Sequence, residues 1–331
     1  MVSLVATAIF ARRAPWRYHP LRMPPKARGP LPDKPGPYSA RLKRLASLLR
    51  ASGVGHLLAT SPVDVGYLTG FLGGESVLLV AADNSRPIVI SDFRYEEELA
   101  PVRPIADLHI RSATGKGESM PRAIAAVFAG RGVQRCGFQA DHLTVAARDE
   151  IASLVGAKKL VPLTGLVAQM RIIKDEHEIR LMKAATRLQE DALSAVLPTI
   201  RPGQSELEIA ARLEAEMKAR GSSQPGFPSI VAAGATGSLP HYRPGRRKAA
   251  AGKSLLIDWG ATFHGYQSDM TRTFALGAWP RKIREIYEIV LEAQQESAAA
   301  LAPGRTNHEV DGIARGIITR AGYGEQFGHG L

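Results

Sequence analysis

Residues 257–273, IDWGATFHGYQSDMTRT, place two carboxylates, Asp258 and Asp269, beside runs of residues that are typical of β-strands. The apolar run before Asp258 and the alternating MTRTF after it predict a β-hairpin whose loop lies near residues 262–264. A hairpin centred in that loop would place Asp258 directly opposite Asp269. We therefore expect both carboxylates on one face of a sheet, with Cβ atoms about 4.5–5.5 Å apart.

Two like charges at this separation repel, so either one carboxylate is protonated or a cation lies between them. A pair of divalent ions about 3.5–4 Å apart, bridged by the two acids, is one arrangement that satisfies both carboxylates. A pair that shares a proton is another. The structural alternative is that one acid caps the turn and the other is exposed, with a shifted register that puts them on opposite faces. The residues alone leave these alternatives open.

Composition narrows the class of protein. The 331 residues include 45% hydrophobic side chains, enough for a packed core, and one cysteine, Cys136, which excludes an intramolecular disulfide. A single cysteine favours a reducing compartment, so we expect a cytoplasmic protein. No apolar run approaches the roughly 18–20 residues of a membrane helix, and no membrane partner is expected.

The charge is concentrated at the N-terminus. Residues 1–37 hold seven basic side chains, one acidic side chain and eight prolines, which predicts a disordered basic leader. About half of the formal net charge of +12 therefore lies in this leader. The excess in the rest of the chain is modest, and no nucleic-acid partner is expected.

The rest of the chain predicts two domains. Residues 38–163 alternate helical and strand-like segments, which predicts an α/β domain. Residues 166–331 hold two long helices, a β section with the hairpin, and two more helices, which predicts an α+β domain with helices packed on one sheet. The buried face predicted for the first long helix, from residue 174 onward, holds Ile179, Met182, Ala185 and Leu188.

The hairpin segment DWGATFHGYQSDMTRTF resembles the D-x-G…G-Y-x-S-D-x-T-R-T signature of the proline-specific pita-bread metallopeptidases, the aminopeptidase P and prolidase (Xaa-Pro dipeptidase) family. The likeness spans about residues 39–331. It implies a creatinase-like N-terminal domain over 38–163 and a pita-bread catalytic domain over 166–331. Other segments that agree are PGFPSIVAAGATGSLPHYRP (225–244), MRIIKDEHEIRLMKAA (170–185), YLTGFLGG (67–74) and SDFRYEEE (91–98).

The resemblance also implies a ligand set. The family holds two divalent ions with two aspartates, one histidine and two glutamates, and the aspartates correspond to Asp258 and Asp269. His241 and His329 correspond to residues that bind and orient substrate. The metal-binding histidine would fall two positions after Leu331, and the two glutamates later still. We therefore expect an incomplete catalytic domain: a fragment, a frameshift product or a non-catalytic relative.

By resemblance, the complete protein would be a metal-dependent hydrolase of peptide bonds that involve proline, either an Xaa-Pro aminopeptidase or an Xaa-Pro dipeptidase. Its substrates would be short proline-containing peptides, and it would form a homodimer. Manganese is the expected metal because the ligands are mostly oxygens, with cobalt or zinc as alternatives. We expect no hydrolysis by the 331-residue chain itself. The alternative is a binding protein of the same fold without catalysis, a pseudopeptidase.

A run of basic residues follows His241 in the segment HYRPGRRK. One interpretation is a solvated surface loop. The other is a positive patch that attracts the C-terminal carboxylate of a short peptide. The run comprises Arg243, Arg246, Arg247 and Lys248.

Overall fold

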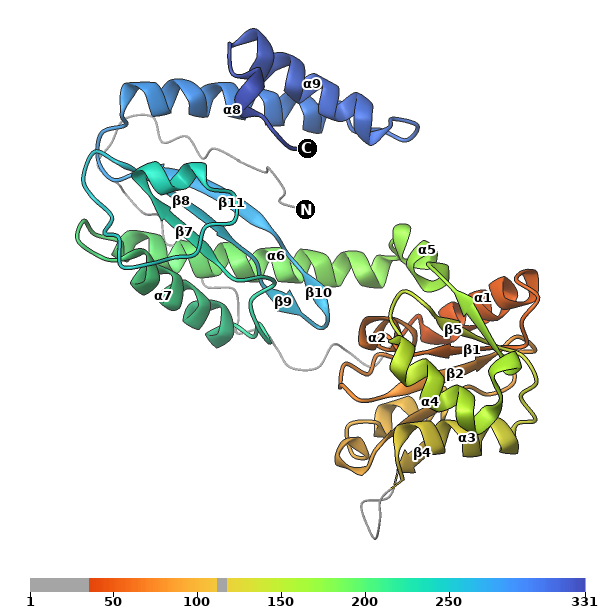
Figure 1. Ribbon diagram of the computed structural model, residues 1–331. Helices are drawn as coiled ribbons and strands as arrows, with labels where there is room; N and C mark the ends of the chain where they lie inside the picture. Colours follow the sequence, from red (N-terminus) through yellow and green to blue (C-terminus); the bar gives the residue numbers. More distant parts are fainter. Residues whose placement is uncertain (1–35, 112–117, 331) are drawn as a thin grey trace. The chain divides into compact units, whose positions relative to one another are not determined.

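The computed structural model describes residues 36–111 and 118–330 (Figure 1), so the predicted leader lies outside the described residues apart from its last two positions. The described chain divides into two compact units, and the division falls between Ile179 and Arg180 in the sequence. The first is the predicted α/β domain and the second is the predicted α+β domain. Within the described ranges, none of the helices has the length and apolarity needed to cross a bilayer.

A six-stranded sheet, with strand order β4-β3-β2-β1-β5-β6, forms the centre of the first unit. Strands β1, β5 and β6 run parallel, β3 and β4 run parallel, and β2 is antiparallel to both of its neighbours. Alternate residues of the central strands enter two different hydrophobic clusters, so the sheet is covered on both faces, as in other α/β domains. The strands are β1 (His56–Ala59), β2 (Val77–Ala81), β3 (Ile88–Asp92), β4 (Asp107–Arg111), β5 (Cys136–Gln139) and β6 (Leu160–Leu163).

Helices α1 and α5 contribute to the cluster on one face, and α3 and α4 to the cluster on the other. Two short 3-10 turns, η1 and η2, follow β3. Burial in β5 makes the Cys136 side chain inaccessible. The helical elements are α1 (Tyr38–Ala51), α2 (Pro62–Thr69), η1 (Phe93–Tyr95), η2 (Ala100–Val102), α3 (Met120–Gly130), α4 (Val145–Val155), η3 (Ala157–Lys159) and α5 (Leu166–Ile172).

The division between the units lies later in the chain than the boundary expected at residues 163–166. The reason is that α5 belongs to the first unit: Val167 and Met170 are buried in the same cluster as Leu45 and Leu49 of α1. The first unit also holds an ionic contact at the start of the next helix, α6 (Glu176–Val196). There the buried Arg41 side chain lies 2.7 Å from Asp175 and 3.4 Å from Glu178.

The second unit has a three-stranded antiparallel sheet in the order β11-β8-β7. Helices α6 and α7 cover one face of this sheet (Figure 1), and their apolar side chains meet Leu255, Ile257 and Trp259 of β8. Helices α8 and α9 lie side by side and share a smaller cluster of their own.

The elements of this unit are α6 (Glu176–Val196), which begins just before the division, η4 (Leu197–Thr199), α7 (Glu206–Ala219), β7 (Ile230–Ala233), η5 (Gly234–Ser238), β8 (Ser254–Trp259), β9 (Thr262–Phe263), β10 (Tyr266–Gln267), β11 (Met270–Ala275), α8 (Arg281–Ala299), α9 (Asn307–Arg320) and η6 (Gly324–Gln326).

Candidate metal and substrate site

The predicted hairpin is present, but its register differs from the prediction. Strands β8 and β11 pair so that Asp258 lies opposite Thr271, and the direct opposition of Asp258 and Asp269 is wrong by two residues. The cause is the turn, whose tip is His264–Gly265, with φ angles of 47° and 80°. Two successive left-handed residues make the type I′ turn that suits the twist of a two-residue hairpin.

The shift does not change the face on which the carboxylates are expected, because side chains of a strand alternate with a period of two. Ile257 and Trp259 point into the core formed with α6 and α7, so Asp258 between them lies on the other face. The same register continues to Ser268, whose N–H donates to Ala261 O at 2.9 Å. Asp269 is therefore a diagonal neighbour of Asp258, a geometry in which Cβ atoms lie within about 7–8 Å.

Asp258 is a buried carboxylate, with 5% of its surface exposed. Thr271 Oγ1 donates a hydrogen bond of 2.9 Å to its Oδ1. Burial raises the pKa of Asp258 to about 6; the Thr271 hydrogen bond opposes this shift, and the negative charge of Asp269 adds to it. No lysine or arginine among the described residues forms an ion pair with Asp258.

Asp269 is exposed, yet the surrounding protein removes enough of its hydration to raise its pKa as well. Both shifts mean that the negative charges are under-compensated. Carboxylate oxygens on one sheet face are hard ligands that suit a divalent cation such as Mn²⁺. Within residues 36–111 and 118–330, however, no three His, Cys, Asp or Glu side chains are grouped so as to hold a metal ion. Asp258 and Asp269 are thus the two carboxylates of the described chain that could contribute to such a site, and their role as metal ligands stays a prediction.

The two predicted substrate histidines are both exposed. His241 lies in the loop that connects η5 to β8. His329 follows α9, with its Nδ1 2.8 Å from Gly330 O, and its own carbonyl accepts a hydrogen bond of 2.9 Å from Arg315. Among the described residues neither histidine is hydrogen-bonded to Asp258 or Asp269, and their substrate roles stay predictions.

Sequence reasoning missed two side chains near the site. Thr271 orients Asp258, and its position follows directly once the turn is placed at His264–Gly265. Glu206, the first residue of α7, is fully buried and binds the loop that carries His241. Its neighbours Ser205 and Glu208 form a capping box, a pattern that a sequence can reveal, but nothing in the sequence marks Glu206 as buried.

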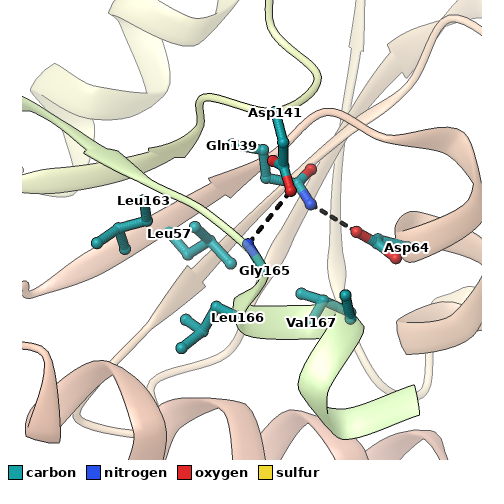
Figure 2. A pocket seen from close by; sticks show the side chains of 9 residues that line it. Leu57, Asp64, Gln139, Asp141, Leu163, Gly165, Leu166 and Val167 are labelled. Atoms are coloured by element: carbon teal, nitrogen blue, oxygen red, sulfur yellow. Dashed lines mark hydrogen bonds between the residues drawn. The ribbon is translucent and has the colours of Figure 1, made fainter. Parts of the chain in front are cut away.

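A separate hollow lies in the first unit, at the ends of β5 and β6 (Figure 2). Gln139 Nε2 donates to Asp64 Oδ2 at 2.6 Å, and Gly165 N donates to Asp141 Oδ2 at 3.2 Å. The volume of about 10 Å³ is close to the space that one water molecule requires, so no peptide can enter. These contacts instead attach α2 to β5 and the start of α5 to the turn that follows β5.

The pattern for metallopeptidase family M24 matches residues 180–331, and the pattern for the creatinase/prolidase N-terminal domain matches residues 41–173. An uncharacterised peptidase of Bacillus subtilis is 32% identical over 87% of this chain and 80% of its own length. An Xaa-Pro dipeptidase of Pyrococcus horikoshii is 30% identical over 88% of this chain and 80% of its own length.

The same similarity extends to three dimensions. The solved structure of an Xaa-Pro dipeptidase from Bacillus anthracis aligns with a TM-score of 0.81 at 33% identity, and the match covers 88% of this chain and 80% of that one. Sequence and fold agree over both units, and the family is one of metal-dependent peptidases. The chain therefore belongs to metallopeptidase family M24, with a creatinase-type N-terminal domain before a pita-bread peptidase domain.

Proposed function

We propose that this protein hydrolyses Xaa-Pro dipeptides with the help of a dinuclear manganese centre, and that Asp258 and Asp269 are two of its ligands. The observation that carries the proposal is the under-compensated carboxylate of Asp258, which shares a sheet face with Asp269. Dipeptides are favoured over longer peptides because the relatives described above with a named activity, at 30% and 33% identity, are Xaa-Pro dipeptidases, whereas a similar X-Pro aminopeptidase from Thermotoga maritima is 28% identical.

Each residue has a distinct part in this proposal. Bound divalent ions would supply an activated water and polarise the scissile carbonyl. Thr271 holds the Asp258 carboxylate through a hydrogen bond to Oδ1, and Oδ2 would be the oxygen that binds a metal ion. His241 and His329 bind the peptide and donate hydrogen bonds where negative charge develops on the carbonyl oxygen.

The basic run beside His241 supports a substrate with a free carboxylate. Arg243, Arg246, Arg247 and Lys248 are all exposed, so they can meet an incoming peptide. In a dipeptide the C-terminal carboxylate lies next to the scissile bond, within reach of such a patch. The homodimer and the cytoplasmic location suggested by the sequence stay predictions.

A second candidate function is peptide binding without catalysis. It is favoured by one observation, namely that the described residues group no three metal-binding side chains. The predicted inactivity of the 331-residue chain, by contrast, gains no support from relatives that match over about four-fifths of their length.

The test is hydrolysis of an Xaa-Pro dipeptide by the 331-residue chain in millimolar Mn²⁺, compared with the same protein in EDTA. In place of the inactivity expected from the sequence, which the relatives do not support, we expect turnover that requires the metal and that is lost in Asp258→Asn and Asp269→Asn. Asp149→Asn, at an exposed acid on α4, is the matched control. Saturable peptide binding without turnover would favour the second function, and turnover that persists in Asp269→Asn would refute the ligand assignment.

A further inference from the structure

Glu206 is a carboxylate with no exposed surface, at the first position of α7. A buried carboxylate is costly unless hydrogen bonds or a cation replace its hydration. Here four donors surround it, two on each oxygen. Oε1 accepts from Ala233 N (2.8 Å) and Thr236 Oγ1 (3.0 Å), and Oε2 accepts from Tyr242 Oη (2.7 Å) and Gly245 N (3.1 Å).

The two carboxylate oxygens of Glu206 bind opposite ends of the same loop. Oε1 binds the beginning of the loop, at the end of β7 and in η5, whereas Oε2 binds its far end. His241 lies between the two attachment points. The backbone adds two more contacts at the far end, from Glu206 N to Arg247 O (2.9 Å) and from Leu207 N to Gly245 O (3.1 Å). The side chain of Glu206 thus attaches both ends of the loop 233–245 to the start of α7.

This loop lies on the same face of the sheet as Asp258. A Cβ atom placed on Gly237 in η5 would lie 3.8 Å from the Cβ of Leu256, so the loop packs over that residue. Leu256 and Asp258 are two residues apart on β8 and therefore point to the same side. The segment held by Glu206 is thus folded over the face that carries the candidate metal ligands.

We propose that Glu206 is a positioning residue: it fixes both ends of the loop 233–245 and so holds His241 in place to bind substrate. The role of His241 rests on the function proposed above, whereas the anchoring of the loop does not. Hydrogen bonds to a charged acceptor are about twice as strong as neutral ones, and four of them converge here. Charge-assisted hydrogen bonds to Glu206 therefore hold the loop in addition to its packing.

Glu206→Gln tests the anchoring with almost no change in volume. The amide nitrogen cannot accept a hydrogen bond, so it must face one of the two pairs of donors. A hydroxyl can turn and become an acceptor, but the backbone N–H of Ala233 or Gly245 cannot. We expect amide hydrogen exchange of residues 233–245 to accelerate about tenfold or more, as for loss of one charge-assisted hydrogen bond.

Glu208→Gln is the matched control. Glu208 lies on the same turn and is exposed. Among the described residues it accepts only from Ser205, in the capping box, a role that glutamine also fills. Exchange of residues 233–245 should be unchanged in this variant. Unchanged exchange in Glu206→Gln would overturn the inference.

A double-mutant cycle with Mn²⁺-loaded protein tests the link to His241. Glu206→Gln should lower kcat/KM for an Xaa-Pro dipeptide about 10- to 100-fold. In a protein that already carries His241→Ala it should lower kcat/KM little further, because both substitutions remove the same interaction, that of His241 with the substrate. Strictly additive losses would overturn the positioning role, even with faster exchange. Absence of turnover in the unmodified protein would count against the proposed function instead, and hydrogen exchange would still decide the anchoring.

Discussion

Replacing Asp258 with asparagine should stabilise the metal-free protein at neutral pH. Asparagine keeps the oxygen that accepts from Thr271 Oγ1, but it removes a charge that burial and Asp269 both disfavour. The folded pKa of about 6, against about 3.9 for an unfolded chain, corresponds to at most about 3 kcal/mol at about 1.4 kcal/mol per pH unit. Asp269 is exposed, so water screens its repulsion of the Asp258 charge. We therefore expect Asp258→Asn to raise the free energy of unfolding by about 1–2 kcal/mol.

The sign of the effect gives the experiment its pH profile. Because the folded pKa of Asp258 is raised, the charged form destabilises the fold. The penalty is absent below about pH 4, where the carboxyl group is protonated in both states, and it is complete above about pH 6. The advantage of the variant should therefore appear between these values and then remain constant.

The assay is urea unfolding of both proteins in EDTA from pH 4 to pH 8, with Asp149→Asn as an exposed control that should stay within about 0.5 kcal/mol at every pH. A variant that is no more stable at pH 8 than the unmodified protein would refute the reasoning. So would a stability difference between the two proteins that does not change with pH.

Three further predictions concern other parts of the chain. Mn²⁺ should raise the melting temperature of the unmodified protein but not of Asp258→Asn, as followed by calorimetry; equal shifts would show that the metal binds elsewhere. Arg41→Met should destabilise the first unit by about 3–5 kcal/mol in chemical denaturation, because Asp175 and the buried Glu178 lose their shared cation; a change below about 1 kcal/mol would contradict this. Cys136, whose thiol has its pKa raised to about 12 by burial, should react with a disulfide reagent only after unfolding, and rapid labelling of the native protein would show that β5 opens.

The hairpin shows what strand alternation can and cannot predict. The apolar run and the MTRTF pattern correctly predicted two antiparallel strands, because the side-chain alternation of a strand can be recognised from a short stretch of sequence. The position of the turn was wrong, because Gly265 allows His264 and itself to form a tighter loop than the one expected at residues 262–264. The error was an even number of residues, so the face assigned to the acids did not change.

Helix α6 shows a different limit. The helical period correctly predicted an amphipathic helix, and Ala185 and Leu188 are buried as expected. Ile179 and Met182, however, are 41% and 38% exposed, and Leu181 is buried in their place. Neighbouring apolar stripes on a helix differ by only one residue in sequence. The surface packed against the helix decides which stripe is buried, and that surface is formed by segments distant in the chain.

The same limit explains why Glu206 could not be found from the sequence. Its four donors come from a loop 27–39 residues further along the chain, and only the folded loop brings them to one carboxylate. Asp258 and Asp269 could be found from the sequence because they occupy fixed positions in a recognisable sequence motif. A buried acid with backbone partners has no such spacing.

The buried Cys136 gives the protein a practical property. It is the sole thiol in the chain and lies within the sheet of the first unit, so a fluorophore or spin label added to the native protein has no natural attachment point. A cysteine introduced at the exposed Ser238, in η5, would then be a unique handle on the segment that Glu206 anchors. A label at that position would report the motion of this one loop during peptide binding, without background signal from the rest of the molecule.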